Sequence, residues 1–147
     1  MKQQKGFTLI ELLVVIAIIA LLSTLAVVAL GSARQKSRDA KRLADVKQLS
    51  TVLELYFTDQ NLYPTSAGVT LGGSTAVCLG TNGFQASGLC SGTTYLATVP
   101  SSPTPPPGNV YTYTSTDGST YSIAFTLEGT SGGLALGIHT QTPAGLQ

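Results

Sequence analysis

The sequence has 147 residues, and its charged fraction of 10% is well below the roughly 25% of an ordinary globular protein. All eight Lys and Arg residues lie between Lys2 and Lys47, and residues 48–147 carry four charged side chains, all of them acidic. This length accommodates one domain with an appendage, and the low charge is typical of an exported or filament-packed protein rather than a cytosolic enzyme. The weakly acidic carboxyl-terminal part is also a poor partner for nucleic acid on its own.

Residues 7–30 form an apolar run in which Glu11 is the only charged residue. As an α-helix this run would span roughly 36 Å, enough to cross a hydrocarbon core of about 30 Å. An ionisable group in such a segment is costly and is usually functional. The run therefore predicts a transmembrane helix in which Glu11 has a specific task.

The helical pattern continues through residues 31–61. Apolar residues recur at three- and four-residue steps and form one stripe, made of Leu43, Val46, Leu49, Val52, Leu53 and Tyr56. Asp39 can pair with Arg42, and Lys41 with Asp45, one turn apart. Pro64 disfavours helix at the preceding residue, so we expect the helix to end near 59–61. A helix of this length, roughly 80 Å, cannot bury both of its ends in a small globule.

Residues 62–109 are rich in Gly, Ser and Thr and are interpreted as a surface loop region that ends in the Pro-rich connector "SSPTPPPGN" (101–109). Cys78 and Cys90 are the only two cysteines. Behind a membrane-targeting segment they favour a disulfide over two unpaired thiols. Such a bond would stabilise the fold by roughly 3 kcal/mol.

Residues 110–147 carry strand signals. Residues 110–114 are β-prone, Asp117-Gly118 is a hairpin signal, and residues 121–128 alternate between apolar and polar side chains. Leu134, Leu136 and Ile138 alternate in the same way and predict a third strand with an apolar face, while His139 would face solvent. The predicted fold class is α+β, with a long amino-terminal helix whose second half packs on a small antiparallel β-meander.

Two ordinary interpretations of the amino terminus compete with a functional one. A secretory signal peptide would explain Lys2, Lys5 and the apolar run, with a loose cleavage site before Val27. A plain membrane anchor would explain the run alone. Neither interpretation explains Glu11.

The segment "KGFTLIELLVVIAIIALL", residues 5–22, resembles the class III leader and amino-terminal segment of bacterial type IV pilins and type II secretion pseudopilins. This resemblance implies cleavage by a prepilin peptidase after Gly6 and N-methylation of Phe7, the new amino terminus. It also implies that Glu11 neutralises the terminal amine of an adjacent subunit as the apolar helices assemble. "QNLYPTSAG", residues 60–68, resembles the helix exit of major pseudopilins.

The predicted function is that of a structural subunit of a type IV pilus-like surface filament, acting in adhesion, motility or DNA uptake. A major pseudopilin working as a short periplasmic piston is the alternative. The expected partners are other copies of the chain, the prepilin peptidase, the assembly machinery of the inner membrane, and membrane lipid before assembly. The expected location is the cytoplasmic membrane, with a single pass, and later an extracellular filament.

Other chemistry is not favoured by the sequence. The basic cluster 34–47 could touch DNA, but we favour a solvated helix face that pairs with acidic residues of neighbouring subunits. His139 lacks partners for catalysis, and no phosphate-binding loop is present. Asp117 and Glu128 are too few for a calcium cage. We therefore expect no enzyme activity, no cofactor and no metal.

Overall fold

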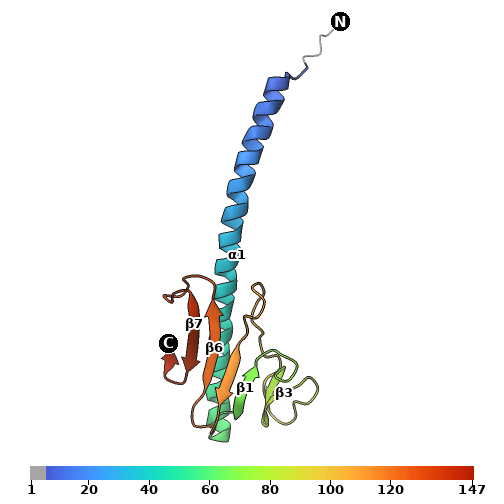
Figure 1. Cartoon of the computed structure of the whole chain (residues 1–147). Helices are drawn as coiled ribbons and strands as arrows, with labels where there is room; N and C mark the ends of the chain where they lie inside the picture. The colour runs from blue at the N-terminus through green and yellow to red at the C-terminus, as the bar shows by residue number, and fades with distance from the viewer. Residues whose placement is uncertain (1–5) are drawn as a thin grey trace. The chain divides into compact units, whose positions relative to one another are not determined.

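A computed structural model describes residues 6–147 (Figure 1). The leader residues Lys2 and Lys5 lie outside the described residues. The chain divides into two compact units, the first ending at Gln35 and the second comprising Lys36–Gln147. The element order is one helix followed by eight strands, an α+β arrangement that confirms the predicted fold class.

The helix α1 comprises Leu9–Gln60. Its end follows from Asn61, which adopts a positive φ of 55° and donates its backbone N–H to the carbonyl oxygen of Phe57 at 2.8 Å. Asn tolerates this left-handed conformation, which commonly terminates helices, and Pro64 follows shortly after. The end predicted from the sequence is confirmed.

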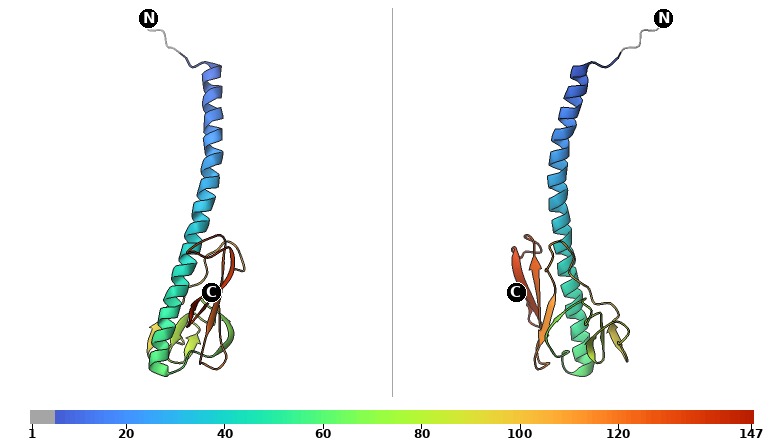
Figure 2. Two further views of the ribbon diagram at one scale, coloured as in Figure 1. Left: turned by 90° about the vertical axis from the view of Figure 1, so that its left-hand side faces the viewer. Right: turned by 45° about the vertical axis from the view of Figure 1, so that its right-hand side comes forward.

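The second unit, residues 36–147, contains two antiparallel sheets. The larger has the strand order β1-β5-β6-β7-β8 and the smaller the order β3-β2-β4. The larger sheet consists of β1 (Ser66–Thr70), β5 (Thr112–Ser115), β6 (Ser122–Leu127), β7 (Gly137–Thr142) and β8 (Gly145–Leu146), and the smaller of β2 (Cys78–Gly80), β3 (Gly83–Gln85) and β4 (Thr94–Leu96). Figures 1 and 2 show the larger sheet lying along the part of α1 that belongs to this unit.

The core lies between α1 and the inner face of the larger sheet. The predicted helix stripe supplies one side, with four of its residues buried and two half-buried against them. The sheet supplies Tyr111 and Tyr113 from around β5 and Tyr121, Ile123, Phe125 and Leu127 from around β6, all at most 2% exposed. The alternating burial along β6 confirms the period of two that the sequence predicts.

The β5–β6 hairpin forms where Asp117-Gly118 predicts it. Gly118 has a φ of 75°, a conformation that glycine adopts without steric cost, and Asp117 Oδ1 accepts the backbone N–H and hydroxyl of Ser119. The carbonyl oxygen of Gly118 accepts the backbone N–H of Tyr63 at 2.8 Å. The turn is therefore attached to the segment that leaves the helix.

Two expectations need correction. Residues 62–109 were expected to be loop, yet β1–β4 lie there, because short strands of Gly, Ser and Thr give no clear alternation. The predicted third strand, residues 134–138, is shifted, since β7 comprises Gly137–Thr142. Its core side is also inverted. Leu136 and Ile138 are exposed, whereas His139, predicted to face solvent, is half-buried opposite Phe125.

Candidate functional site

The candidate assembly segment is the first described part of the chain, from Gly6 through residue 30. Gly6 and Phe7 precede the helix, and Phe7 is 92% exposed. A side-chain carbon placed on Gly6 would meet no atom within 4 Å. Both residues of the predicted cleavage site are therefore accessible.

Glu11 lies in the first turn of α1, and its carboxylate is held by Thr8. Its Oε2 accepts the backbone N–H of Thr8 at 2.8 Å and the Thr8 hydroxyl at 2.7 Å, while the Thr8 hydroxyl lies 3.3 Å from the backbone nitrogen of Glu11. This reciprocal arrangement is a capping box, in which a hydroxyl residue and a Glu three positions later satisfy the free donors of a helix start. The T-x-x-E spacing of Thr8 and Glu11 signals this cap, which was not among the predictions made from the sequence.

The rest of the segment presents apolar side chains to its surroundings. Every residue from 9 to 30 is exposed, and α1 is the one helix within residues 6–147 that is long and apolar enough to cross a membrane. Its two central hydroxyls are satisfied within the helix, because Ser23 donates to the Ile19 carbonyl oxygen and Thr24 to that of Leu21. Internal satisfaction is what a hydrocarbon environment requires.

Phe7, Ile10, Glu11, Val14 and Val15 line a shallow hollow on one face of this segment. An apolar surface with one carboxylate at its edge suits contact with another apolar helix that brings a positive charge. This geometry agrees with the role that the sequence resemblance implies for Glu11.

Comparison with known proteins covers the same part of the chain. Residues 1–31 match the family described as the prokaryotic N-terminal methylation motif. The type II secretion system core protein G of Aeromonas hydrophila is 38% identical over 65 residues, and that of Escherichia coli (strain K12) is 39% identical over 64 residues. The chain therefore carries this methylation motif and is similar in its first half to proteins named type II secretion system core protein G.

The relatives include both kinds of filament protein. The type IV wide pilus major component PilA4 of Thermus thermophilus is 39% identical over 66 residues. The matched regions cover 44–45% of this chain, 46% of the A. hydrophila protein, 44% of the E. coli protein and 50% of PilA4. The chain thus spans half or less of the length of these relatives. No solved structure matches it.

The second unit contains an ionic cluster, which we define as the buried Asp39 and Arg42 together with the half-buried Arg38 and Glu128. Arg42 is 0% exposed, and its guanidinium lies 2.6 Å from Asp39 Oδ1 and 2.5 Å from Glu128 Oε1. Arg38 forms a further ion pair with Glu128. Asp39 accepts the backbone N–H groups of Glu128 and Gly129 at 3.0 and 2.9 Å.

Arg42 also binds the Pro-rich connector, since it donates to the Ser102 hydroxyl and to the carbonyl oxygens of Pro103 and Pro105. Hydrogen bonds from Arg38 and Arg42 to Glu128 hold the pKa of this carboxyl at about 2, although its burial opposes the shift. The cluster therefore fastens the connector and the end of β6 to the first turns of the domain's helix.

This cluster corrects the interpretation of the basic segment 34–47. The predicted Asp39–Arg42 and Lys41–Asp45 pairs are confirmed, at 2.6 Å each. Arg38 and Arg42, however, pair with Glu128 of the same chain rather than form a solvated face for neighbouring subunits. The sequence gives no signal for these pairs, because 86 and 90 residues separate the partners.

Asp45, on α1 next to the ionic cluster, connects the helix to the segment that leads into β5. Its Oδ2 accepts the Tyr111 hydroxyl at 3.0 Å, and both residues are buried. Burial and the nearby Asp45 charge raise the pKa of Tyr111 well above its usual value. The tyrosine therefore stays a neutral donor, as a structural role requires.

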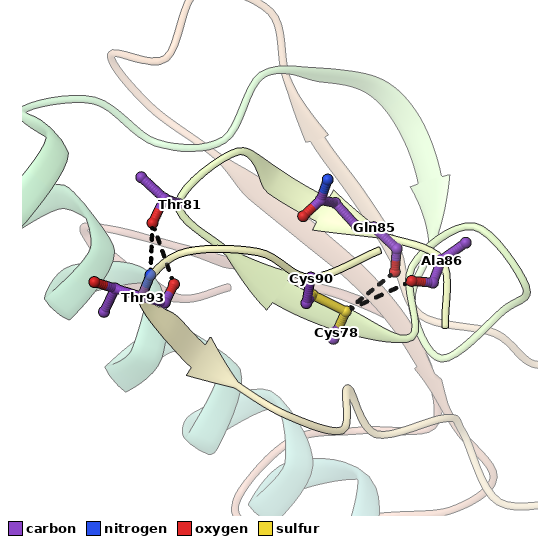
Figure 3. Close-up of a disulfide and its surroundings, with 6 residues drawn as sticks. All are labelled: Cys78, Thr81, Gln85, Ala86, Cys90 and Thr93. Carbon is purple, nitrogen blue, oxygen red and sulfur yellow. Dashed lines mark hydrogen bonds between the residues drawn. A yellow bond between two sulfur atoms is a disulfide. The ribbon is translucent and has the colours of Figure 1, made fainter. Parts of the chain in front are cut away.

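Cys78 and Cys90 form a disulfide, which confirms the predicted bond (Figure 3). The Sγ of Cys78 lies 3.6 Å from the carbonyl oxygen of Gln85 and 3.7 Å from that of Ala86. Thr81 and Thr93 are joined by two hydrogen bonds further along the same loop. These contacts connect the irregular segment 86–93 to the small sheet.

Within residues 6–147, no three His, Cys, Asp or Glu residues are grouped so that they could hold a metal ion. The relatives described above are named as a core protein of the type II secretion system and as the major component of a type IV wide pilus. The apolar segment and its exposed amino terminus therefore constitute the candidate functional site, and the second unit is the folded domain attached to it.

Proposed function

We propose that this chain is a filament subunit of the major pseudopilin type, anchored in the cytoplasmic membrane through residues 9–30 before assembly. The observation that carries the proposal is the fully exposed apolar segment with Glu11 at its start. The relatives named type II secretion core protein G and the pseudopilin-like helix exit at residues 60–68 support the pseudopilus over the surface pilus predicted first. The PilA4 relative supports the type IV pilus as the second candidate.

In this proposal a prepilin peptidase cleaves after Gly6, and Phe7 becomes the methylated amino terminus. The exposed, unobstructed Gly6–Phe7 bond supports this step. Mass spectrometry of purified filaments should show chains that begin at N-methylated Phe7. Chains that begin at Met1 or at Val27 would contradict the proposed processing.

Glu11 acts in assembly through the carboxylate oxygen that Thr8 leaves available. Oε2 accepts both Thr8 bonds, whereas Oε1 accepts none from the part of the chain that the structure describes. An ammonium group at the terminus of an adjacent subunit can bind this oxygen without disturbing the helix cap. In a dry helix bundle such an attraction is much stronger than in water, although desolvation offsets part of it.

Three variants separate the charge of Glu11 from its capping role. Glu11→Gln keeps a capping side chain but removes the charge, Thr8→Val removes the cap but keeps the charge, and Glu11→Ala removes both. We expect both Glu11 variants to insert into membranes and to lose most of the filament yield, while Thr8→Val assembles better than either. Filaments of Glu11→Gln at the normal yield would reject the charge-pairing role.

Filament length separates the two candidate functions. Electron microscopy of cells that express the protein with its own assembly system should show short filaments confined to the envelope for a pseudopilin. Long surface filaments would favour the type IV pilus instead. Loss of secreted proteins in a deletion strain would further support the pseudopilin.

A further inference from the structure

An exposed apolar patch lies at one end of the folded domain. We define the end patch as Val110, Leu136 and Ile138, which are 43%, 68% and 76% exposed. Ile138 lies opposite Thr126 in the β6–β7 pairing, and Asn109, next to Val110, donates its side-chain amide to the Thr126 carbonyl oxygen at 3.0 Å. Ile138 lies in β7, Leu136 just before β7 and Val110 just before β5, so these exposed aliphatic residues lie toward the same end of the larger sheet.

The patch differs from the rest of the outer face of this sheet. The neighbouring row across β5, β6 and β7 consists of Thr112, Ala124 and Thr140, which are small or hydroxylated. Single exposed aliphatic residues are ordinary on protein surfaces. Several large aliphatic residues at one end of an otherwise hydroxyl-rich face indicate a contact surface for an apolar partner.

The end patch lies where the chain enters the domain. The loop that carries Leu136 follows β6, whose end is fastened to α1 by Glu128 and Gly129 through Asp39. In the same loop, Gly132 closely approaches the side chain of Leu43. The patch is thus at the end of the domain where its helix begins, with Lys36 as the first residue of the domain.

The charged side chains of the domain that lie outside ion pairs are unevenly distributed between its two ends. At the patch end Lys36 is exposed and makes no ion pair with the described residues, while the charges of the ionic cluster neutralise one another. Lys47, three turns further along the helix, is the other exposed cation of the domain that makes no ion pair with the described residues. The acidic residues outside ion pairs, Glu54, Asp59 and Asp117, lie toward the other end of the domain's helix, and the Asp117 turn binds Tyr63 just beyond it. An anionic surface would therefore attract the patch end and repel the far end.

We propose that the end patch and Lys36 dock the folded domain onto the surface of an anionic phospholipid bilayer while residues 9–30 anchor the chain. This docking rests on the membrane anchoring proposed above. Aliphatic side chains beside a basic residue are the combination that binds bilayer interfaces, where apolar groups enter about 5–10 Å. The anchor keeps the domain close to the bilayer, so a small patch suffices.

Tryptophan fluorescence in the full chain tests the docking, because the natural chain contains no Trp. Ile138→Trp places a reporter in the patch. Leu62→Trp, at a position 44% exposed just beyond the far end of the helix, is the matched control. The variants are reconstituted in vesicles of phosphatidylcholine and phosphatidylglycerol, with one lipid brominated to quench nearby indoles.

We expect at least about twofold stronger quenching in Ile138→Trp than in Leu62→Trp, because only the patch reporter would reach the interface. Lys36→Gln or high salt should weaken this quenching, since salt shortens the screening length from about 10 Å at 0.1 M to about 3 Å at 1 M. Lys47→Gln removes the same charge three turns further along and should have the smaller effect. Leu136→Trp provides a second reporter if Ile138→Trp does not fold.

Flotation of the same vesicles distinguishes a failure of the membrane anchoring from a failure of the docking alone. A chain that does not float with the vesicles would reject the membrane anchoring and, with it, the docking. A chain that floats but shows equal quenching in Ile138→Trp and Leu62→Trp would reject the docking alone. The same measurement in lipid nanodiscs that hold one chain each tests whether a single copy suffices. If the quenching of Ile138→Trp disappears there, contact between the patch and lipid depends on a second copy, and this outcome also overturns the proposal.

Discussion

The two parts of α1 place their side chains in opposite ways. From residue 9 to residue 30 the helix exposes nearly every apolar side chain it has, whereas from residue 36 onward it buries charged side chains such as Asp39 and Arg42. The apolar part has no packing partner among the described residues 6–35, and its length and composition fit a membrane span. The second part finds its partners in the strands and the connector, so it is complete within one chain.

The two parts of α1 also differ in where their charged side chains find partners. Glu11 receives two hydrogen bonds from Thr8, both at Oε2, and its Oε1 accepts none from the described residues, which leaves this oxygen free for the assembly role proposed above. Arg42 has all of its partners in the folded domain. Removal of Glu11 should therefore affect assembly, whereas removal of Arg42 should affect folding.

The largest stability effect is expected for Arg42→Met. It leaves the carboxylates of Asp39 and Glu128 in the cluster without their shared cation and detaches the connector. Breaking a buried pair by removing one partner typically lowers the free energy of unfolding by about 3–5 kcal/mol. Urea unfolding of the detergent-solubilised chain measures this loss.

Lys47→Met is the matched control for Arg42→Met. Lys47 lies on the same helix, is exposed, and forms no ion pair with the described residues. Its replacement should change the free energy of unfolding by less than about 0.5 kcal/mol. A loss below about 1 kcal/mol for Arg42→Met would show that the cluster is not an essential part of the domain.

Acid should weaken the same cluster through Glu128. Its pKa is lowered from 4.5 to about 2 in the folded chain, chiefly by the hydrogen bond from Arg38. The stabilisation is therefore fully present above pH 4.5 and is lost as the pH falls through about 2.

Urea unfolding from pH 6 down to pH 2 measures this dependence, and Glu128→Gln is the comparison. The variant lacks the titrating group, so its stability should fall less steeply over the interval between the two pKa values. Parallel curves for the two proteins would show that another carboxyl group controls the acid response.

The disulfide should contribute less than the ionic cluster. Cys78 and Cys90 are 12 positions apart, and closing a loop of this size restricts the unfolded chain by about 3 kcal/mol at most. The double variant Cys78→Ser/Cys90→Ser should lose about 2–3 kcal/mol and remain folded. Reduction of the natural chain should reproduce this loss, and an unchanged stability would show that the segment 86–93 is held by its hydrogen bonds alone.

The parts of the fold that sequence predicts are those with local signals. The helix end at Asn61, the hairpin at Asp117-Gly118 and the alternation of β6 each depend on neighbouring residues. The partners of Arg38 and Arg42 could not be predicted, because Glu128 is distant in sequence and a helix face rich in Lys and Arg normally faces solvent. Arg42 is buried because the tertiary fold brings Glu128 and the Pro-rich connector against this face of the helix.

The candidate site shows the same division. The accessible Gly6, the exposed Phe7 and the position of Glu11 follow from a local motif, and the cap by Thr8 could have been predicted from its spacing. The phase of β7 could not, because the large apolar residues at positions 134, 136 and 138 mark one face as the core side, whereas the pairing with β6 turns Ile138 outward. A shift of one residue exchanges the two faces of a strand, so Ile138 faces outward and His139 inward.

The outward orientation of Ile138 predicts the smallest change in stability among the variants considered. Ile138→Thr replaces a side chain that is 76% exposed and retains a β-branched residue beside Thr126, so the free energy of unfolding should change by no more than about 0.5 kcal/mol. Ile123→Thr, at a position 0% exposed, should instead lose about 2 kcal/mol or more, because it buries a hydroxyl and removes a core methyl group. Similar losses in both variants under urea would mean that Ile138 packs inward, and would restore the register that the sequence alone predicts.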